Sequence, residues 1–146
     1  MSGIDPSQIG PQEFAQLVKT SSDDQIETLI HDAGAEPTLT RIFRGFEERF
    51  VPAKAEGVTA DIQFLIKDEG EEHPYVVAIK DGTCETRRAK AEDPKTTLSL
   101  NLLPFVKLIT GQADGMKLFM TRKLKISGDI MFAQQVLTFF DRPSAG

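Results

Sequence analysis

Residues able to do acid–base, nucleophilic or metal chemistry are few in this 146-residue chain, and they are scattered. The two histidines, His31 and His73, do not stand in a metal-ligand spacing such as H-E-x-x-H, and we expect both at the surface. Cys84 is the single cysteine, and it alternates with charged residues on an expected strand, which favours a small packing role over a nucleophilic one. No G-x-S-x-G elbow, Walker loop or dinucleotide fingerprint occurs.

One acid–base arrangement stays open on the sequence. Asp61 and Tyr75 would form such a pair, as a small α+β isomerase or hydrolase requires, only if both faced one pocket. Asp61 alternates with Ile62 and Phe64 on an expected strand, so it is predicted on the opposite face from them. This enzyme alternative therefore requires Asp61, Tyr75 or His73 to face a cavity. We predict no catalytic residue, no metal and no cofactor.

The composition is that of one globular domain, with 40% hydrophobic and 27% charged residues. Ten phenylalanines, one tyrosine and no tryptophan give an aromatic set that fills apolar space with few hydrogen-bonding groups. No intrachain disulfide is possible with one cysteine, and no window reaches the ~20 apolar residues of a membrane span. The N-terminal stretch has no basic region followed by an apolar run, so we expect a cytoplasmic location.

Charge is distributed unevenly along the chain, whose net charge is -5. Residues 1–36 hold seven acidic residues and one basic residue, whereas residues 107–125 hold five basic residues and one acid. This balance argues against nucleic-acid binding, which normally needs a basic face on a basic domain. The basic cluster is either a solvated surface or a surface that attracts anionic lipid head groups.

Helical spacing dominates the first third of the chain. Pro11 stands at a first helical position, and Ser22 with Gln25 has the pattern of a capping box, so two short helices are predicted. A third helix is predicted from Pro37 to the Val51-Pro52 break, because the residue before a proline disfavours helix. Its apolar stripe is Leu39, Ile42, Phe43, Phe46 and Phe50.

From Ala60 the apolar period changes to two, which predicts strands, and Asp81-Gly82 predicts a hairpin between the second and third strands. The predicted order is helix, three antiparallel strands, crossover, strand, helix, strand, helix. This order defines an α+β domain with one mixed five-stranded sheet covered on one face by helices. The predicted units are an acidic helical extension at 1–36, a body at 37–142 and a tail at 143–146.

Residues 119–140, FMTRKLKISGDIMFAQQVLTFF, place methionines and aromatic residues beside a short basic strand. By periodicity alone they are either ordinary core or the wall of a cavity for an apolar molecule. The run from residue 111 to 140 resembles the C-terminal signature of the sterol carrier protein type 2 family, in which Gly-Lys-Leu-Lys-Ile-x-Gly-Asp/Asn precedes a Met- and Leu-bearing helix. The match comprises Phe119, Lys123-Leu124-Lys125-Ile126, Gly128-Asp129 and Ala133 through Phe140.

Upstream, residues 81–111 resemble the family's Asp-Gly hairpin, its Asp-Pro-x-x-Thr-Leu strand entry and its Phe-x-x-Leu-x-x-Gly helix. Arg122 departs from the pattern, because the family commonly has glycine there. The resemblance covers about residues 37–142 and implies a lipid-binding domain with an apolar tunnel between sheet and helices, walled by the C-terminal helix.

The function implied is non-enzymatic carrying of a fatty acid, acyl-CoA, sterol-like or polyketide-like molecule, with transient contact to a membrane surface. A monomer or weak dimer is expected. Candidate tunnel residues are Phe43, Phe46, Ile62, Phe64, Phe105, Leu108, Ile109, Met116, Phe119, Met120, Ile130, Met131, Val136, Leu137 and Phe140. Candidate residues for the tunnel mouth and an anionic head group are Lys117, Arg122 and Lys123. The main alternative is a protein-interaction module with the same fold and a filled core, whose acidic helices bind a partner.

Overall fold

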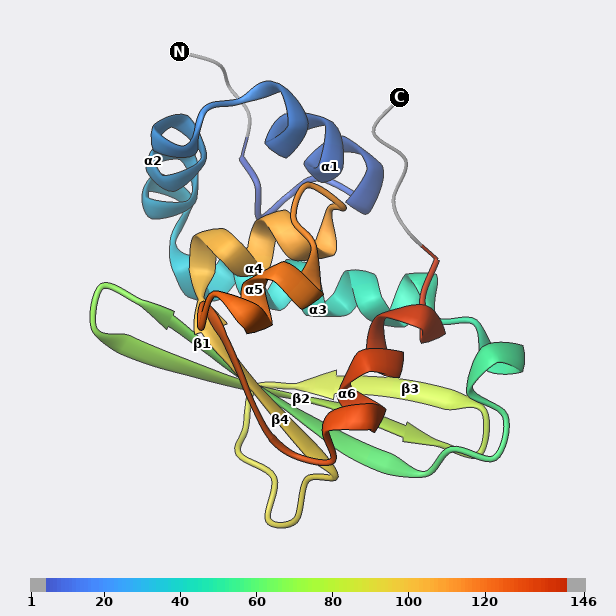
Figure 1. Ribbon diagram of the computed structural model, residues 1–146. Coiled ribbons are helices and arrows are strands. Elements are labelled where there is room, and N and C mark those ends of the chain that lie inside the picture. Colours follow the sequence, from blue (N-terminus) through green and yellow to red (C-terminus); the bar gives the residue numbers. More distant parts are fainter. Residues whose placement is uncertain (1–4, 142–146) are drawn as a thin grey trace.

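The period-two segments form one mixed sheet in the order β3-β2-β1-β4-β5, in a computed structural model that describes residues 5–141 (Figure 1). The strands are β1 (Ala60–Asp68), β2 (Glu71–Lys80), β3 (Thr83–Arg87), β4 (Thr96–Asn101) and β5 (Leu124–Gly128). β1 pairs with β4 in parallel, and the other neighbouring pairs are antiparallel. The predicted α+β fold with a mixed five-stranded sheet is confirmed.

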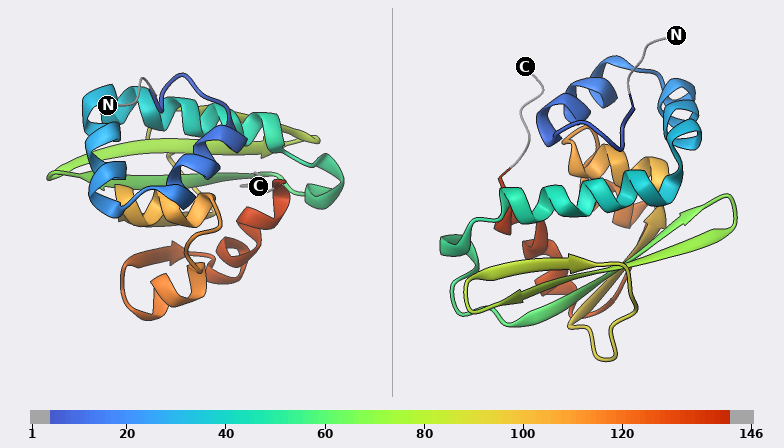
Figure 2. Two further views of the ribbon diagram at one scale, coloured as in Figure 1. Left: turned by 90° about the horizontal axis from the view of Figure 1, so that it is seen from above. Right: turned by 180° about the vertical axis from the view of Figure 1, so that it is seen from behind.

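The helices begin at the residues whose side chains can cap them. Ser22 forms the predicted capping box with Gln25, and Asp114 and Asp129 accept hydrogen bonds from the first-turn amides of their helices. The helical elements are α1 (Pro11–Thr20), α2 (Asp23–Ala33), α3 (Ala35–Arg49), η1 (Pro52–Ala55), α4 (Leu102–Ile109), α5 (Gly115–Met120), α6 (Ile130–Val136) and η2 (Leu137–Phe139). α3 and α4 lie over the sheet, and α1 with α2 lies on the far side of them (Figures 1 and 2).

The third helix begins earlier than predicted, since α3 begins at Ala35, two residues before Pro37. α4 begins at Leu102 and likewise has a proline, Pro104, in its first turn. A proline is tolerated in the first turn because the N–H it lacks would have no intrahelical partner there. The predicted hairpin at Asp81-Gly82 is confirmed, and both residues have positive φ, 51° and 75°, as a type I′ turn requires.

The core centres on Phe43 of α3, which is 1% exposed. Its ring stacks on Tyr75 of β2 with centroids 4.5 Å apart, and it contacts Phe64 of β1 at 5.3 Å and Phe105 of α4 at 5.4 Å. Aromatic pairs of this kind stabilise by about 0.5–1.5 kcal/mol each beyond the area they bury. This cluster therefore fixes α3 and α4 on the central strands.

The acidic N-terminal helices pack on this body. Phe14, Val18, Ile26 and Ile30 lie in the same buried apolar cluster as α3. An ion pair between Asp23 of α2 and Lys107 of α4 joins the two layers. The division at residue 36 stays a prediction, and the predicted tail at 143–146 lies outside the described residues.

The strands bury two long polar side chains, those of His73 and Gln63. His73 is 6% exposed, so its predicted surface position is wrong. β2 begins at Glu71, which places His73 in strand register with Tyr75 on the face that the helices cover. Gln63, on the other face, is 3% exposed because the chain after β3 crosses it; its Nε2 donates to Ala89 O, and its Oε1 accepts from Ala91 N.

Gly128 provides a test of close packing between β5 and the segment that leads into β4. Its φ is +83°, and a Cβ added there would lie 2.7 Å from Lys95 O. We expect Gly128→Ala to lower the free energy of unfolding by about 3 kcal/mol, from backbone strain and overpacking together. Urea denaturation measures this change.

The matched control is Gly82→Ala, which has a φ of +75° and no heavy atom within 4 Å of the added Cβ. Strain alone should lower its unfolding free energy by about 1 kcal/mol. Equal losses in the two variants would show that the contact with Lys95 has no effect.

Candidate functional site

The structure divides the predicted tunnel residues into a buried group and a surface group. The buried residues pack on one another between the sheet and the helices, as the 5.0 Å ring contact between Phe46 and Phe140 shows. This group comprises Phe43, Phe46, Ile62, Phe64, Phe105, Ile109, Val136 and Phe140. Leu108 and Leu137 are half-buried.

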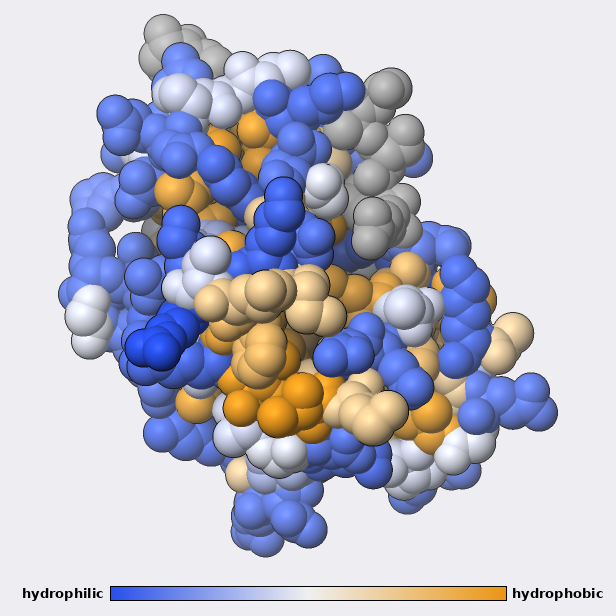
Figure 3. All heavy atoms as spheres, viewed as in Figure 1, coloured by the Kyte–Doolittle hydropathy of each residue, from blue (hydrophilic) through white to orange (hydrophobic). Residues whose placement is uncertain are grey.

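The surface group lies on α5 and the first turn of α6. Met116, Phe119 and Met120 are 50%, 37% and 74% exposed, and Ile130 and Met131 are 43% and 75% exposed. Within residues 5–141 these five are the large hydrophobic side chains that face solvent. Apolar side chains gather over α5 and the start of α6 on this face of the molecule (Figure 3). We call these five residues the α5–α6 apolar surface.

The exposure of α5 follows from its length and its single anchor. Leu118 is its one buried residue and packs in the core. The side chains of Met116, Phe119 and Met120 therefore point outward. Asp114 fixes the start of the helix, because its side chain accepts a hydrogen bond from the Met116 amide at 2.9 Å. A six-residue helix held in this way presents most of its side chains to water.

Arg122 occupies the turn that ends α5. Its φ is +65°, and the amides of Arg122 and Lys123 donate to Phe119 O and Leu118 O at 3.1 and 2.8 Å. These two bonds form a Schellman motif, whose left-handed position favours glycine. Glycine, which the resemblance pattern has at this position, suits this left-handed backbone, whereas arginine adopts it under strain.

A basic rim borders the α5–α6 apolar surface. Lys117, Arg122 and Lys123, the predicted mouth residues, are all exposed. Within the part of the chain that the structure describes, none of the three forms an ion pair with an acidic side chain. Apolar side chains next to unpaired positive charge suit an amphipathic anion.

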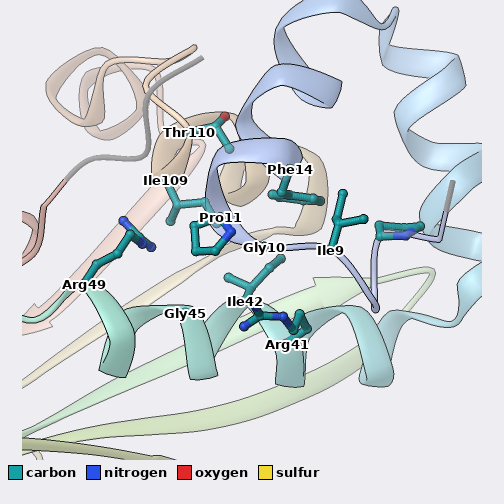
Figure 4. A pocket seen from close by; sticks show the side chains of 11 residues that line it. Ile9, Gly10, Pro11, Phe14, Arg41, Ile42, Gly45, Arg49, Ile109 and Thr110 are labelled. Carbon is teal, nitrogen blue, oxygen red and sulfur yellow. The ribbon is translucent and has the colours of Figure 1, made fainter. Parts of the chain in front are cut away.

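Two cavities lie away from this surface. The first, about 20 Å³, is lined by residues of α1 and the segment before it, of α3 and of the end of α4, and Ile109 is its one predicted tunnel residue (Figure 4). It has room for about one water molecule. The second, about 170 Å³, lies between α3 and strands β2 and β3, and Phe43 is its one predicted tunnel residue. Neither cavity joins the buried group to the surface group, so the tunnel stays a prediction.

The Asp61–Tyr75 acid–base pair does not form. Tyr75 pairs with Phe64 in strand register and faces the helices, whereas Asp61 pairs with Ala78 and faces the other side of the sheet. Burial raises the pKa of Tyr75, although the Thr40 hydroxyl, 3.0 Å from its own, opposes the shift. The Tyr75 hydroxyl is therefore neutral at physiological pH.

Cys84 is half-buried against the core, as its predicted packing role requires. Burial raises the pKa of its thiol to about 12, and the nearby carboxylates of Glu47 and Glu85 add to the shift. A thiol with so high a pKa is almost fully protonated near neutral pH and is a poor nucleophile. Within residues 5–141 no three His, Cys, Asp or Glu side chains are grouped to hold a metal ion.

Sequence reasoning missed the basic lining of the second cavity. Arg44 comes from α3, whereas Arg87 and Arg88 come from the end of β3 and the residue after it. The Arg87-Arg88 pair was visible in the sequence, but its approach to Arg44 depends on how α3 crosses the sheet.

Residues 39–141 match the SCP-2 sterol transfer family, and this chain belongs to that family. It is 31% identical over 111 residues to the oleate-induced peroxisomal protein POX18 of Candida maltosa, covering 74% of this chain and 87% of that protein. Sterol carrier protein 2 from Yarrowia lipolytica, solved in its apo form, is 26% identical with a TM-score of 0.54 and covers 66% of this chain and 91% of that chain.

The sec-alkylsulfatase Pisa1 from a Pseudomonas species gives a TM-score of 0.65 at 15% identity, which shows the shared fold alone. That match covers 73% of this chain but only 17% of the sulfatase. The resemblance found in residues 37–142 is thus confirmed as family membership.

Among the described helices, none combines the length and the apolar character that crossing a bilayer needs.

Replacing Arg122 tests the account of the α5 turn. We expect Arg122→Gly to raise the free energy of unfolding by about 0.5–1 kcal/mol, because relief of left-handed strain exceeds the extra entropy of glycine in the unfolded chain. Urea denaturation provides the measurement. Arg122→Ala is the control, since it keeps a Cβ at the strained position and should give no gain. A loss of stability in the glycine variant would show that the arginine side chain makes stabilising contacts.

Proposed function

We propose that the protein is a non-enzymatic carrier of an apolar ligand, and that the ligand binds at the α5–α6 apolar surface. Membership of a sterol transfer family supports a lipid or sterol-like ligand, with fatty acid and acyl-CoA as further candidates. The observation that carries this proposal is the exposure of five large apolar side chains on two short, neighbouring elements. Contiguous exposed apolar surface of this kind marks ligand-binding or membrane-binding sites.

The composition of the surface suits varied hydrocarbon chains. Three of its five residues, Met116, Met120 and Met131, have unbranched, polarisable side chains that adapt to different shapes. Burying each ligand methylene contributes about 0.8 kcal/mol, so ten carbons give about 8 kcal/mol when fully buried. Association costs roughly 4–15 kcal/mol, and a site open to water on one side recovers only part of the gain.

The ligand chain therefore needs more cover than the surface alone provides. We place the rest of it beneath α6, against Val136, Leu137 and Phe140, which the sequence predicts as tunnel residues. Phe140 belongs to the buried group and contacts Phe46 and Phe50, so a chain that enters here displaces contacts of these rings. The head group of an anionic ligand then lies at the basic rim, where Lys117, Arg122 and Lys123 make charge-assisted contacts with it.

Charge substitution on α5 tests the site. We expect Phe119→Asp and Met120→Asp each to weaken binding of a fluorescent fatty acid by about tenfold or more, because a carboxylate then faces the hydrocarbon chain. The control is Gln134→Asp on α6, which adds the same charge at another exposed position and removes no large apolar side chain. Unchanged affinity in both α5 variants would rule out this surface as the site. Native mass spectrometry of freshly purified protein would identify a co-purifying lipid.

Transient contact with a membrane gives this surface access to its ligand. We propose that the α5–α6 apolar surface and its basic rim touch anionic bilayers, where each lysine near the surface contributes about 1 kcal/mol. Vesicles that contain phosphatidylserine should sediment with the protein, and vesicles of phosphatidylcholine alone should not. Lys117→Gln together with Lys123→Gln should lower that binding by about tenfold or more. Equal binding to both kinds of vesicle would contradict an electrostatic contribution.

A further inference from the structure

A basic pocket lies at the opposite edge of the sheet from the α5–α6 apolar surface. The strand order places β3 at one edge and β5 at the other. The pocket has a volume of about 170 Å³ and lies between α3 and strands β2 and β3. Its lining residues are Thr40, Phe43, Arg44, Glu47, Tyr75, Thr86, Arg87 and Arg88.

Positive charge dominates the lining. Three arginines face one carboxylate, that of Glu47, which already accepts hydrogen bonds from the Thr86 amide at 2.6 Å and the Thr86 hydroxyl at 2.9 Å. Arg88 lies 3.7 Å from a carboxylate oxygen of Glu36. Within residues 5–141, Arg44 and Arg87 form no ion pair. This concentration of guanidinium groups stands on a protein with a net charge of -5.

Besides Thr86, two residues with hydroxyl groups, Thr40 and Tyr75, line the pocket. The hydroxyl oxygens of Thr40 and Tyr75 are 3.0 Å apart, and the Tyr75 hydroxyl group donates to Glu36 O at 3.3 Å, which leaves the Thr40 hydroxyl group to donate to Tyr75. The ring of Phe43 stacks on Tyr75 and is 1% exposed, so it forms a rigid apolar floor. Charged donors around a rigid apolar floor are the elements of a small anion site.

We propose that this pocket binds a phosphate group. The planar fork of each guanidinium group matches phosphate oxygens in pairs, and three arginines suit the several acceptor oxygens of a phosphate better than the two of a carboxylate. At about 170 Å³ the pocket is smaller than the roughly 300 Å³ that whole ligands need, so it holds the phosphate and its nearest atoms. The phosphate belongs either to a phospholipid head group or to a small phosphorylated compound in solution.

The pocket contains its own optical probe. Tyr75 is the only tyrosine in the chain, and there is no tryptophan, so tyrosine emission reports on this pocket alone. We expect inorganic phosphate, titrated at ionic strength held constant with sodium chloride, to change that emission with saturation. Arg44→Gln and Arg87→Gln should each weaken binding by about tenfold, the effect of losing one charged hydrogen-bonding partner.

Arg41→Gln is the matched control for Arg44→Gln. It removes the same charge from the same helix, but Arg41 does not line the pocket and pairs instead with Glu48. Phosphate affinity should stay within about twofold of the parent in this variant. Arg44 and Arg87 are exposed, so both test variants should keep the parent's unfolding midpoint in urea.

Two further titrations separate the sources of the phosphate. A soluble short-chain phosphatidic acid that binds more tightly than inorganic phosphate, and that requires Arg44, would assign the pocket to a lipid head group. Binding of inorganic phosphate alone would assign it to a small phosphorylated compound.

The proposal fails if sodium chloride gives the same emission change, or if Arg44→Gln and Arg41→Gln have the same effect on phosphate affinity. It also fails if a short-chain fatty acid binds through Arg44 while phosphate does not. Binding of a fluorescent fatty acid at α5 is read separately, so the two proposals can fail independently.

Discussion

The stacking of Phe43 on Tyr75 is the contact on which the arrangement of this domain depends. It ties α3 to the sheet at the centre, and the contacts of Phe43 with Phe64 and Phe105 tie β1 and α4 to the same point. These rings fill the middle of the space between the helices and the sheet. We therefore expect ligand contacts to develop away from this cluster, toward the β3 and β5 edges of the sheet.

The two edges of the sheet differ in chemistry. At the β5 edge the short helix α5 has one apolar anchor and exposes methionines that would otherwise stabilise the core, and this exposure has a cost in folding free energy. At the β3 edge the stacked Tyr75 ring carries its hydroxyl into a pocket lined by arginines. A lipid with a phosphate head group presents both chemistries, but one molecule would have to span the width of the sheet to use both edges.

Most of the fold could be predicted because its signals are local. The capping box at Ser22, the Asp81-Gly82 turn and the caps at Asp114 and Asp129 each depend on residues within a few positions of one another. Burial is not local in this sense. The chain after β3 covers Gln63, which alternation alone could not show, and His73 faces inward because β2 begins at Glu71, so that the alternation of Tyr75 and Val77 extends back to it.

The site was predictable in composition but not in arrangement. Met120 and Phe105 have the same apolar character in the sequence, yet one is 74% exposed and the other is fully buried. The difference lies in how each helix is packed, since α4 lies between the sheet and α2 whereas α5 has only Leu118 in the core.

Burial also affects how the alternative of an interaction module can be tested. Because Phe14 and Ile26 belong to the common buried cluster, deleting residues 1–36 would expose part of the core. If the shortened protein then lost a partner, the loss could come either from the missing binding surface or from unfolding of the domain. Any partner of the acidic helices has to be recognised by their exposed carboxylates, such as Asp24 and Glu27, and these can be changed without touching the core.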